Sequence, residues 1–548
     1  MCSSDLWPCK NPGEDARLYK AVEACSDFAC ELGINIPTGK DSLSMTQKYY
    51  DNNVYSPGTV IISAAAEVEN IRKIVSPVLA YIKGTYLYYI DFSFDTFKLG
   101  GSALAQTMSK VGDEAPTVKD SEYFKNAFTA VQELVKRGLI LAGHAISAGG
   151  MITTMLEMCF ANPQGGLEAR LDKIRHSDLI KILFSENPGI LIQVKHYRLV
   201  EKILQDYGLG FAIVARPIED RKLIISKDNF QSEFDINELR DVWYHTSYLL
   251  DKKQSGEAKA KERFDNYKQQ PLKYSFNEDF TGKMEDYGID PDRKVRSGIQ
   301  AAIIREKGTN GEREMAYSLY LAGFDVKDVH MTDLTSGREN LEDVQMAVFC
   351  GGFSNSDVFG SAKGWAGGFK YNEKAKTALR NFFARKDTLS LGVCNGCQLL
   401  MELRLIFPEL GEDHPQMQPN LSGKFESAFV SVTIPRNESV MLKSLEGSKL
   451  GVWVAHGEGR FDLQKDESKY NIAAKFVYDE YPGNPNGSDY AAAAVCSNDG
   501  RHLVMMPHLE RVIFPWQNAY YPFKYRKHEV TPWMEAFVNA REWIKKQL

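Results

Sequence analysis

The stretch LSLGVCNGCQLLMEL, residues 389–403, joins a short apolar run, a Gly-x-Cys-x-Gly segment and a run with helical spacing. The apolar run predicts a buried strand, and the residues from Gln398 to Leu403 predict a helix. A nucleophile between two glycines at such a strand-to-helix turn is typical of a nucleophile elbow, because glycine permits the cramped backbone. The helix N-terminus would favour a thiolate at Cys394. The stretch therefore predicts an α/β unit with a reactive cysteine at a strand end.

A cysteine nucleophile needs a base, and the base needs a group that orients it. His508 and Glu510 follow an expected strand at residues 502–506. Side chains two residues apart in an extended segment point the same way, so Glu510 could hold the His508 ring in one tautomer. An exposed histidine and glutamate in a turn would give the same pattern.

A second glycine pair, Gly351 and Gly352, ends the strand expected at residues 346–350. Neighbouring parallel strands end at one edge of a sheet, so a backbone N–H of this pair could face the same oxyanion as the N–H of Asn395, the residue after the cysteine. An ordinary turn between strand and helix would use two glycines equally well.

Cys394 and Cys397 also form a C-x-x-C pair, which allows two other interpretations. A zinc site would need a second pair at ligand spacing, and the sequence has none. A thioredoxin-like redox pair stays open, although the Asn-Gly between the two cysteines fits the elbow better.

From Gly298 onward, strand and helix patterns alternate, as in a parallel sheet covered on both faces. Strands are expected at 299–305, 326–331, 346–350 and 389–393, and helices at 312–322, 374–384 and 397–403. Residues 10–250 instead mix the two types and predict an α+β domain. Its helices are expected at 15–33, 103–108, 123–137 and 151–160, and its strands at 60–68, 86–92, 139–146, 190–194 and 211–214. The fold class is therefore α/β and α+β multidomain.

Residues 251–297 separate these two parts, because they combine a highly charged helical stretch with a segment rich in Pro, Gly, Asp and Lys. The expected domains are thus 10–250, 251–297 and 298–548. Residues 1–9, MCSSDLWPC, are expected to be a non-native start, since CSSDL is what a common sequencing adapter encodes in translation.

Composition excludes several classes of function. The net charge of −6 over 548 residues leaves no basic field for a nucleic-acid backbone. No apolar run approaches the ~20 residues of a membrane helix. Nine scattered cysteines fit reduced thiols and a cytoplasmic location better than a disulfide framework.

Four motifs in the C-terminal part resemble the glutaminase domain of the large, single-chain phosphoribosylformylglycinamidine synthases. They are GVCNGCQ (392–398), CGGFSNSDVFG (350–360), AHGEGR (455–460) and MMPHLERV (505–512). The resemblance implies a class I glutamine amidotransferase domain with Cys394 as nucleophile, His508 as base and Glu510 as its orienting partner. Leu509 stands where the family has proline. His456 could line the glutamine pocket or be structural.

Two motifs in the N-terminal part, PTGKDSLSM (37–45) and LGGSALA (99–105), resemble the second half of the synthetase region of that family. A turn at residues 39–42 would offer backbone amides, the Lys40 ammonium and the Ser42 hydroxyl to a phosphate. Within the resemblance, Lys40, Asp41 and Ser42 are expected nucleotide or substrate contacts. The resemblance adds Ser147 as a nucleotide contact. It also implies an Asp ligand for Mg²⁺ after His144, but this chain has Ala145, which offers no side-chain oxygen, so we expect an incomplete metal site.

The implied reaction uses ATP, Mg²⁺ and glutamine to convert phosphoribosylformylglycinamide into the amidine in purine biosynthesis. The chain would carry the glutaminase and half of the synthetase, with the missing N-terminal half as partner, and no nucleic acid or membrane. An inert fragment that only packs against that half, or a stand-alone cysteine amidase, remains an alternative.

Overall fold

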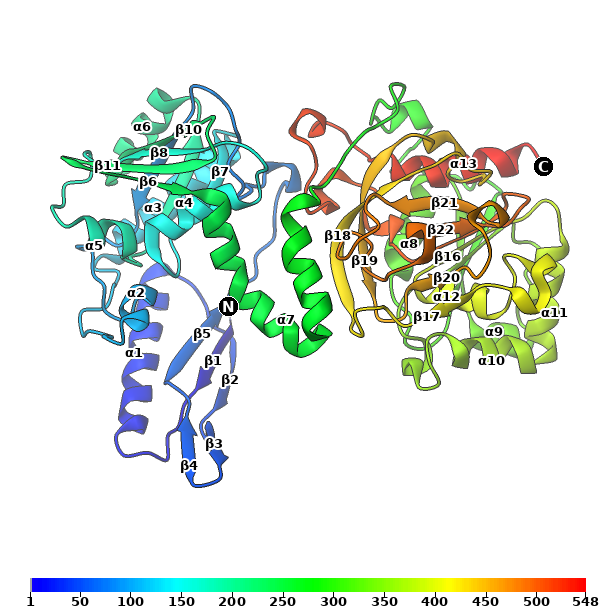
Figure 1. The fold of residues 1–548 in the computed structure, drawn as a ribbon, viewed down its shortest axis with the longest axis horizontal. Coiled ribbons are helices and arrows are strands. Elements are labelled where there is room, and N and C mark those ends of the chain that lie inside the picture. The colour runs from blue at the N-terminus through cyan, green and yellow to red at the C-terminus, as the bar shows by residue number, and fades with distance from the viewer. Residues whose placement is uncertain (1) are drawn as a thin grey trace. The chain divides into compact units, whose positions relative to one another are not determined.

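The computed structural model describes residues 2–548, which divide after Trp243 into two compact units (Figure 1). Helix α7 (Ile236–Asn266) runs through the division and loses its helical backbone at Gly256. No helix in the described part is long and apolar enough to cross a membrane. Residues 244–297, most of α7 and the segment after it, belong with the second unit.

The first unit is built on a seven-stranded sheet with the order β12-β11-β8-β10-β6-β9-β7, in which only β8 and β11 pair in parallel. The strands are β6 (Tyr86–Asp91), β7 (Ile140–Ala145), β8 (Gly166–Arg170), β9 (Gly189–Val194), β10 (Phe211–Ile218), β11 (Lys222–Lys227) and β12 (Phe230–Asp235). The helices are α2 (Ala103–Thr107), α3 (Ser121–Lys136), α4 (Gly150–Phe160), α5 (Leu179–Phe184) and α6 (Tyr197–Asp206).

Helices cover both faces of this sheet. Side chains alternate between the two faces along each strand, so one strand contributes to two separate cores. Leu87 and Tyr89 of β6 enter the core that α4 and α5 share, whereas Tyr88 and Ile90 enter the core of α3 and α6. The predicted helices and strands of residues 86–214 are confirmed, with small shifts at their ends.

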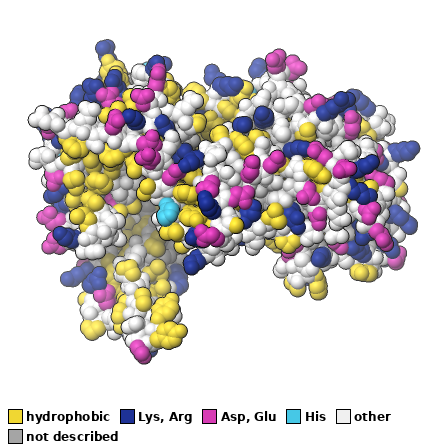
Figure 2. Space-filling view, in the orientation of Figure 1, with side chains coloured by type: hydrophobic (Ala, Val, Ile, Leu, Met, Phe, Trp, Pro, Cys, Tyr) yellow, Lys and Arg dark blue, Asp and Glu magenta, His cyan; other side chains and the backbone are white. Residues whose placement is uncertain are grey.

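A smaller sheet precedes it, with β1 (Cys2–Leu6) between β2 (Thr38–Ser42) and β5 (Thr59–Ser63). Helix α1 (Glu14–Leu32) and the hairpin β3 (Thr46–Tyr49) and β4 (Asn52–Tyr55) complete this part. The turn predicted at residues 39–42 is wrong: these residues lie in β2 and pair with β1. The strand predicted at 60–68 ends at Ser63. Figure 2 shows hydrophobic side chains on this part, where Tyr50, Val54 and Ile61 are exposed.

The second unit contains a nine-stranded sheet in the order β14-β13-β15-β16-β23-β22-β21-β18-β19. Its first five strands are parallel and its last four pair antiparallel. The strands of this unit are β13 (Gln300–Arg305), β14 (Asp325–His330), β15 (Met346–Phe349), β16 (Leu389–Val393), β17 (Gln416–Gln418), β18 (Glu426–Thr433), β19 (Lys449–His456), β20 (Arg460–Asp462), β21 (Asn471–Phe476), β22 (Ala492–Cys496) and β23 (His502–Met505).

One continuous core packs around this sheet. The helices are α8 (Glu312–Leu321), α9 (Met331–Ser336), α10 (Lys363–Tyr371), α11 (Glu373–Ala384), α12 (Asn395–Glu402) and α13 (Trp533–Lys545). The strands and helices predicted from 299 to 403 are confirmed, with ends shifted by no more than two residues. Because β15, β16 and β23 are parallel neighbours, their carboxyl ends place residues 350–352, 394 and 508 at the same edge.

Candidate active site

Cys394 lies between β16 and α12, with its backbone in a sparsely populated region at φ 50° and ψ −107°. Its N–H donates to the carbonyl of Met505 on β23 at 2.9 Å, which fixes the turn against the sheet. A side chain at Gly396 would collide with the backbone of Phe349, so glycine is required for this close approach. Cys394 is 5% exposed, and its sulfur contacts the carbonyl of Ala455 at 3.6 Å. The sequence therefore forms the expected elbow.

His508 and Glu510 lie beside this elbow and are each 2% exposed. His508 Nδ1 and Glu510 Oε1 are 2.7 Å apart. The predicted geometry is wrong in one respect: residues 509–511 form a 3₁₀ turn rather than an extended segment, and this turn brings the carboxylate back to the ring. The backbone N–H of His508 donates to the carbonyl of Trp453 on β19 at 2.9 Å. Because His508 also follows β23 closely in the chain, β19 and β23 together hold the base in place.

The charge of this pair follows from its surroundings. Burial favours a neutral His508 ring, but Glu510 and the hydrogen-bonded Cys394 outweigh it and raise the pKa of His508 to about 10. An imidazolium at neutral pH would stabilise a thiolate beside it. By contrast, burial raises the pKa of Cys397 well above its ordinary value, which leaves that thiol inert.

Gly351 lies against the side chains of His508 and Cys394, and Gly352 follows it just after the end of β15. A Cβ added at Gly351 would be 2.8 Å from His508 Cε1 and 3.3 Å from Cys394 Cβ. Gly352 has φ +117°, and its backbone packs on residues 308–310. Asn395 begins α12, where the first N–H groups have no helical acceptor. The structure thus brings Cys394, His508, Glu510 and the predicted oxyanion donors to one edge.

Sequence reasoning left His456 open and missed the side chains that hold its loop, residues 456–459. Asn420 Nδ2 donates to the His456 carbonyl at 2.7 Å, and Asn486 Nδ2 donates to the Gly459 carbonyl at 2.6 Å. Gln398 Nε2 donates to the Glu458 carbonyl at 2.7 Å. Burial, assisted by the nearby His508, lowers the pKa of His456 to about 3, and neither of its ring nitrogens has a partner within residues 2–548. In the sequence, the asparagines Asn420 and Asn486 were the signal that could have pointed to these loop contacts.

The residues predicted to contact nucleotide are not assembled in the first unit. Lys40 Nζ donates to the Asp41 carbonyl at 2.9 Å and to the Ser42 hydroxyl, all on the surface of β2. Ser147 is exposed in the turn before α4. No hydrogen bond or ion pair joins Ser147 to residues 40–42 in the described structure.

The end of β7, just before this turn, does not fit Mg²⁺. His144 Nδ1 contacts the carbonyl of Ala145, and its Nε2 lies 3.4 Å from Glu157 Oε2. Ala145 supplies no side-chain oxygen. Within the described residues, no group of three or more His, Cys, Asp or Glu side chains could hold a metal ion. The side chains at this place therefore do not by themselves supply the several oxygen ligands that a hard cation needs.

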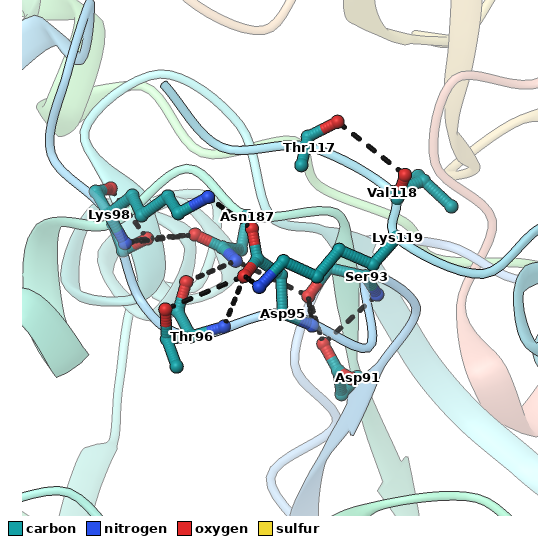
Figure 3. Close-up of polar contacts among 10 residues, drawn as sticks. Asp91, Ser93, Asp95, Thr96, Lys98, Thr117, Val118, Lys119 and Asn187 are labelled. Atoms are coloured by element: carbon teal, nitrogen blue, oxygen red, sulfur yellow. Dashed lines mark hydrogen bonds and ion pairs between the residues drawn. The ribbon is translucent and has the colours of Figure 1, made fainter. Parts of the chain in front are cut away.

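A buried polar network, which sequence reasoning missed, holds the loop after β6 (Figure 3). The Asp95 side chain is fully buried and pairs with Lys98 at 2.7 Å and Lys119 at 2.6 Å. Burial disfavours its charge, but these lysines overcome that and lower the pKa of Asp95 to about 2. Asn187 Nδ2 donates to the Thr96 carbonyl at 3.1 Å. No local pattern predicts this network, because its partners are up to about 90 residues apart.

The elbow cysteine and the histidine–carboxylate pair on neighbouring parallel strands form an arrangement that suits a cysteine nucleophile with its base. Residues 299–544 match the family model of the CobB/CobQ-like glutamine amidotransferase domain. Residues 1–67 match the FGAR-AT PurM_N-like domain, and residues 95–228 match the C-terminal domain of AIR synthase related proteins.

Along nearly its whole length the chain is similar to phosphoribosylformylglycinamidine synthases. It is 37% identical to that enzyme of Homo sapiens in a 580-residue alignment that covers 99% of this chain and 42% of the relative. It is 38% identical to the probable chloroplastic/mitochondrial enzyme of Arabidopsis thaliana, over 98% of this chain and 40% of the relative. The chain thus spans about two fifths of the length of these relatives.

Solved structures give weaker similarity. PurLQS from Thermotoga maritima matches 46% of this chain and 99% of its own, with 24% identity and a TM-score of 0.35. PurL from Thermotoga maritima complexed with FGAR matches 44% of this chain and 39% of its own, with 19% identity and a TM-score of 0.33.

Proposed function

We propose that the second unit hydrolyses the side-chain amide of glutamine and that the chain thereby serves as part of a phosphoribosylformylglycinamidine synthase. One observation carries the proposal: Cys394, His508 and Glu510 meet at the sheet edge inside the region that matches a glutamine amidotransferase model. Similarity to phosphoribosylformylglycinamidine synthases over 99% of the chain supports this family.

The residues assign a role to each group in the hydrolysis. The Cys394 thiolate attacks the amide carbonyl, and the N–H groups of Gly351 or Gly352 and of Asn395 receive the oxyanion. The C–N bond breaks, ammonia leaves with a proton from His508, and a thioester remains. Water then attacks the thioester while His508 takes its proton, which releases glutamate and restores the thiolate. Glu510 holds the ring and stabilises its charged form.

In the complete reaction, the ammonia would replace the formamide oxygen of phosphoribosylformylglycinamide in an ATP-dependent ligation, in purine biosynthesis and in the cytoplasm. The first unit would supply half of that synthetase, with Lys40, Asp41, Ser42 and Ser147 as the proposed nucleotide or substrate contacts. Its residues do not fit Mg²⁺, so no step is assigned to a metal. We propose the remaining part of the synthase, which the relatives' greater length indicates, as the partner.

Two assays test this function separately. Glutamate release from glutamine should be measured for the chain and for Cys394→Ala. Equal rates would contradict the amidohydrolase and favour a fragment without activity. Amidine formation should be measured with the remaining part of a related synthase added in trans. Robust amidine formation by the 548-residue chain alone would contradict the partnership.

A further inference from the structure

We propose that Arg263, on the helix that connects the two units, is a positioning residue for the cysteine site. It would act through Glu426 and Tyr481 on the loop of residues 456–459. The proposal rests on the proposed glutamine hydrolysis and adds a residue that lies outside the matched amidotransferase region, residues 299–544.

The contact begins on the second segment of α7, after the break at Gly256. Arg263 Nη2 donates to Glu426 Oε2 at 2.7 Å and contacts the Tyr481 hydroxyl. The Tyr481 hydroxyl in turn donates to Glu426 Oε1 at 2.8 Å. Glu426 and Tyr481 are each 4% exposed, so these hydrogen bonds lie largely away from water. The guanidinium also lies over the Tyr481 ring, 4.7 Å from its centroid.

The same helical segment holds the backbone of Tyr481. The Tyr481 N–H donates to Glu262 Oε1 at 3.0 Å, and its carbonyl accepts from Asn266 Nδ2 at 2.8 Å. Side chain and backbone are thus both fixed by α7. A displacement of this segment would therefore move Tyr481 with it.

Glu426 is connected to Cys394 through the strand pair β18 and β19. It begins β18 and lies opposite His456, the last residue of β19, in the antiparallel register. The preceding residue of β19 is Ala455, whose carbonyl contacts the Cys394 sulfur at 3.6 Å. One strand pair therefore separates the Arg263 guanidinium from the residues that touch the nucleophile.

Tyr481 is connected to the loop of residues 456–459 through the chain segment that follows it. A few residues after it, Asn486 Nδ2 donates to the Gly459 carbonyl at 2.6 Å. A cavity of about 410 Å³ lies beside this segment, lined by Lys259, Tyr481, Asn484 and Ser488 among others. The side of the segment that faces α7 is thus partly open, which makes the Arg263 contacts important for its position.

Loss of the guanidinium would leave the Glu426 carboxylate buried without its cation, a strongly unfavourable state. The carboxylate would turn toward water and displace the end of β18. A shift of about 1 Å near the reacting atoms can cost about 10²-fold in rate. We therefore expect Arg263→Gln to lower kcat/KM for glutamine about 10- to 100-fold.

The experiment compares two reagents at Cys394, each followed by mass spectrometry: a glutamine-like chloroketone, which must enter the substrate pocket, and iodoacetamide, which need not. In Arg263→Gln we expect labelling by the chloroketone to slow at least about tenfold, while labelling by iodoacetamide stays within about twofold. Arg263→Lys, which keeps the charge, should recover part of the chloroketone rate. Tyr481→Phe, which removes one hydroxyl and keeps the ring, covers the case in which Arg263→Gln does not fold.

Arg293→Gln is the matched control. The Arg293–Asp325 pair has similar burial, with side chains 18% and 11% exposed against 22% and 5% for Arg263–Glu426. It lies at the start of β14, the opposite sheet edge from Cys394, and should leave both labelling rates unchanged. Equal loss in Arg293→Gln, an unchanged chloroketone rate in the Arg263 and Tyr481 variants, or parallel changes with both reagents would overturn the positioning role. A parent chain that neither reacts with the chloroketone nor releases glutamate would instead overturn the proposed function itself.

Discussion

Glycine-rich turns follow strands in both units, but the polar groups around them are arranged differently. In the first unit, Glu186 Oε1 accepts the N–H groups of Ala103 at 2.7 Å and Gly149 at 2.8 Å, so the protein's own carboxylate occupies the donors at two helix starts. Asp95 likewise neutralises two lysines. In the second unit, His456, which follows the residue whose carbonyl contacts the Cys394 sulfur, is buried without a hydrogen-bond partner in the described structure. Buried atoms without a partner also occur in the first unit, among them Trp7 Nε1 and Arg221 Nη2.

This difference teaches what a preformed site requires. In the second unit, hydrogen bonds hold the loops in place, while the Cys394 sulfur, the His508 imidazole and the glycine turn at 351–352 lie at the same edge of the sheet. The first unit uses its charged groups to hold its own loops together. Chemistry at Cys394 should therefore depend on single side chains, whereas changes in the first unit should alter stability without altering hydrolysis.

The largest expected effect is the loss of the nucleophile. Cys394→Ala should lower glutamate release about 10⁴-fold or more, because no other group near the site can form the thioester. A coupled glutamate assay measures it. Cys397→Ala is the control: that thiol is fully buried in α12, so we expect near-parental turnover. Comparable losses in both variants would mean that packing, rather than nucleophilic attack, explains the effect.

The second effect concerns the charge of His508. Glu510→Gln should reduce turnover about 10²- to 10³-fold, because the ring loses the carboxylate that orients it and holds its proton. The raised pKa of about 10 also stabilises the fold. This contribution is fully present below the ordinary pKa of about 6.5 and is lost as the pH rises through about 10.

Urea unfolding at several pH values between 6 and 10.5 measures that contribution. The parent chain should lose stability steadily as the pH rises through this range, and Glu510→Gln should show a flatter profile. An unchanged slope in the variant would show that Glu510 does not set the charge of His508.

Crowding at the oxyanion turn should have the next effect. Gly351→Ala would put a Cβ 2.8 Å from His508 Cε1, so the ring must move and turnover should fall about 10- to 100-fold. Gly367→Ala in α10 is a suitable control, since its Cβ would only touch Tyr371 at 3.9 Å and alanine favours a helix. If Gly351→Ala retains full turnover, the base does not occupy the position described.

The sequence predicted the turn at Cys394 and the contact between His508 and Glu510, because each of these two parts is local. An elbow needs only a strand, two glycines and a helix within fifteen residues, and Glu510 is two residues from His508. The geometry of that pair was mistaken, since a 3₁₀ turn replaces the extended segment. The antiparallel half of the sheet and Arg263 were missed, because their partners lie far away in the sequence.

The first unit was harder to predict for the same reason. The motif at residues 39–42 contains a glycine and polar residues that favour a turn, but pairing with β1 holds it extended. A backbone ladder contributed by a distant segment thus overrides the local preference. The Asp95 network also depends on contacts across the fold, such as that between Asn187 and Thr96.

The smallest expected effect sharpens the contrast between the units, because it should touch stability alone. Asp95→Asn removes the charge between Lys98 and Lys119, whose side chains are 19% and 52% exposed and can still reach water. We therefore expect a loss of only about 1–2 kcal/mol in the first unit.

The lowered pKa of Asp95 contributes stability above about pH 3.8, and this is lost as the pH falls through about 2. The variant should thus lack that acid dependence. Hydrogen exchange of β6 and the loop after it measures the change, and glutamate release should stay at the parental rate. A drop in glutamate release would show that the two units are energetically linked and that the contrast between them does not hold.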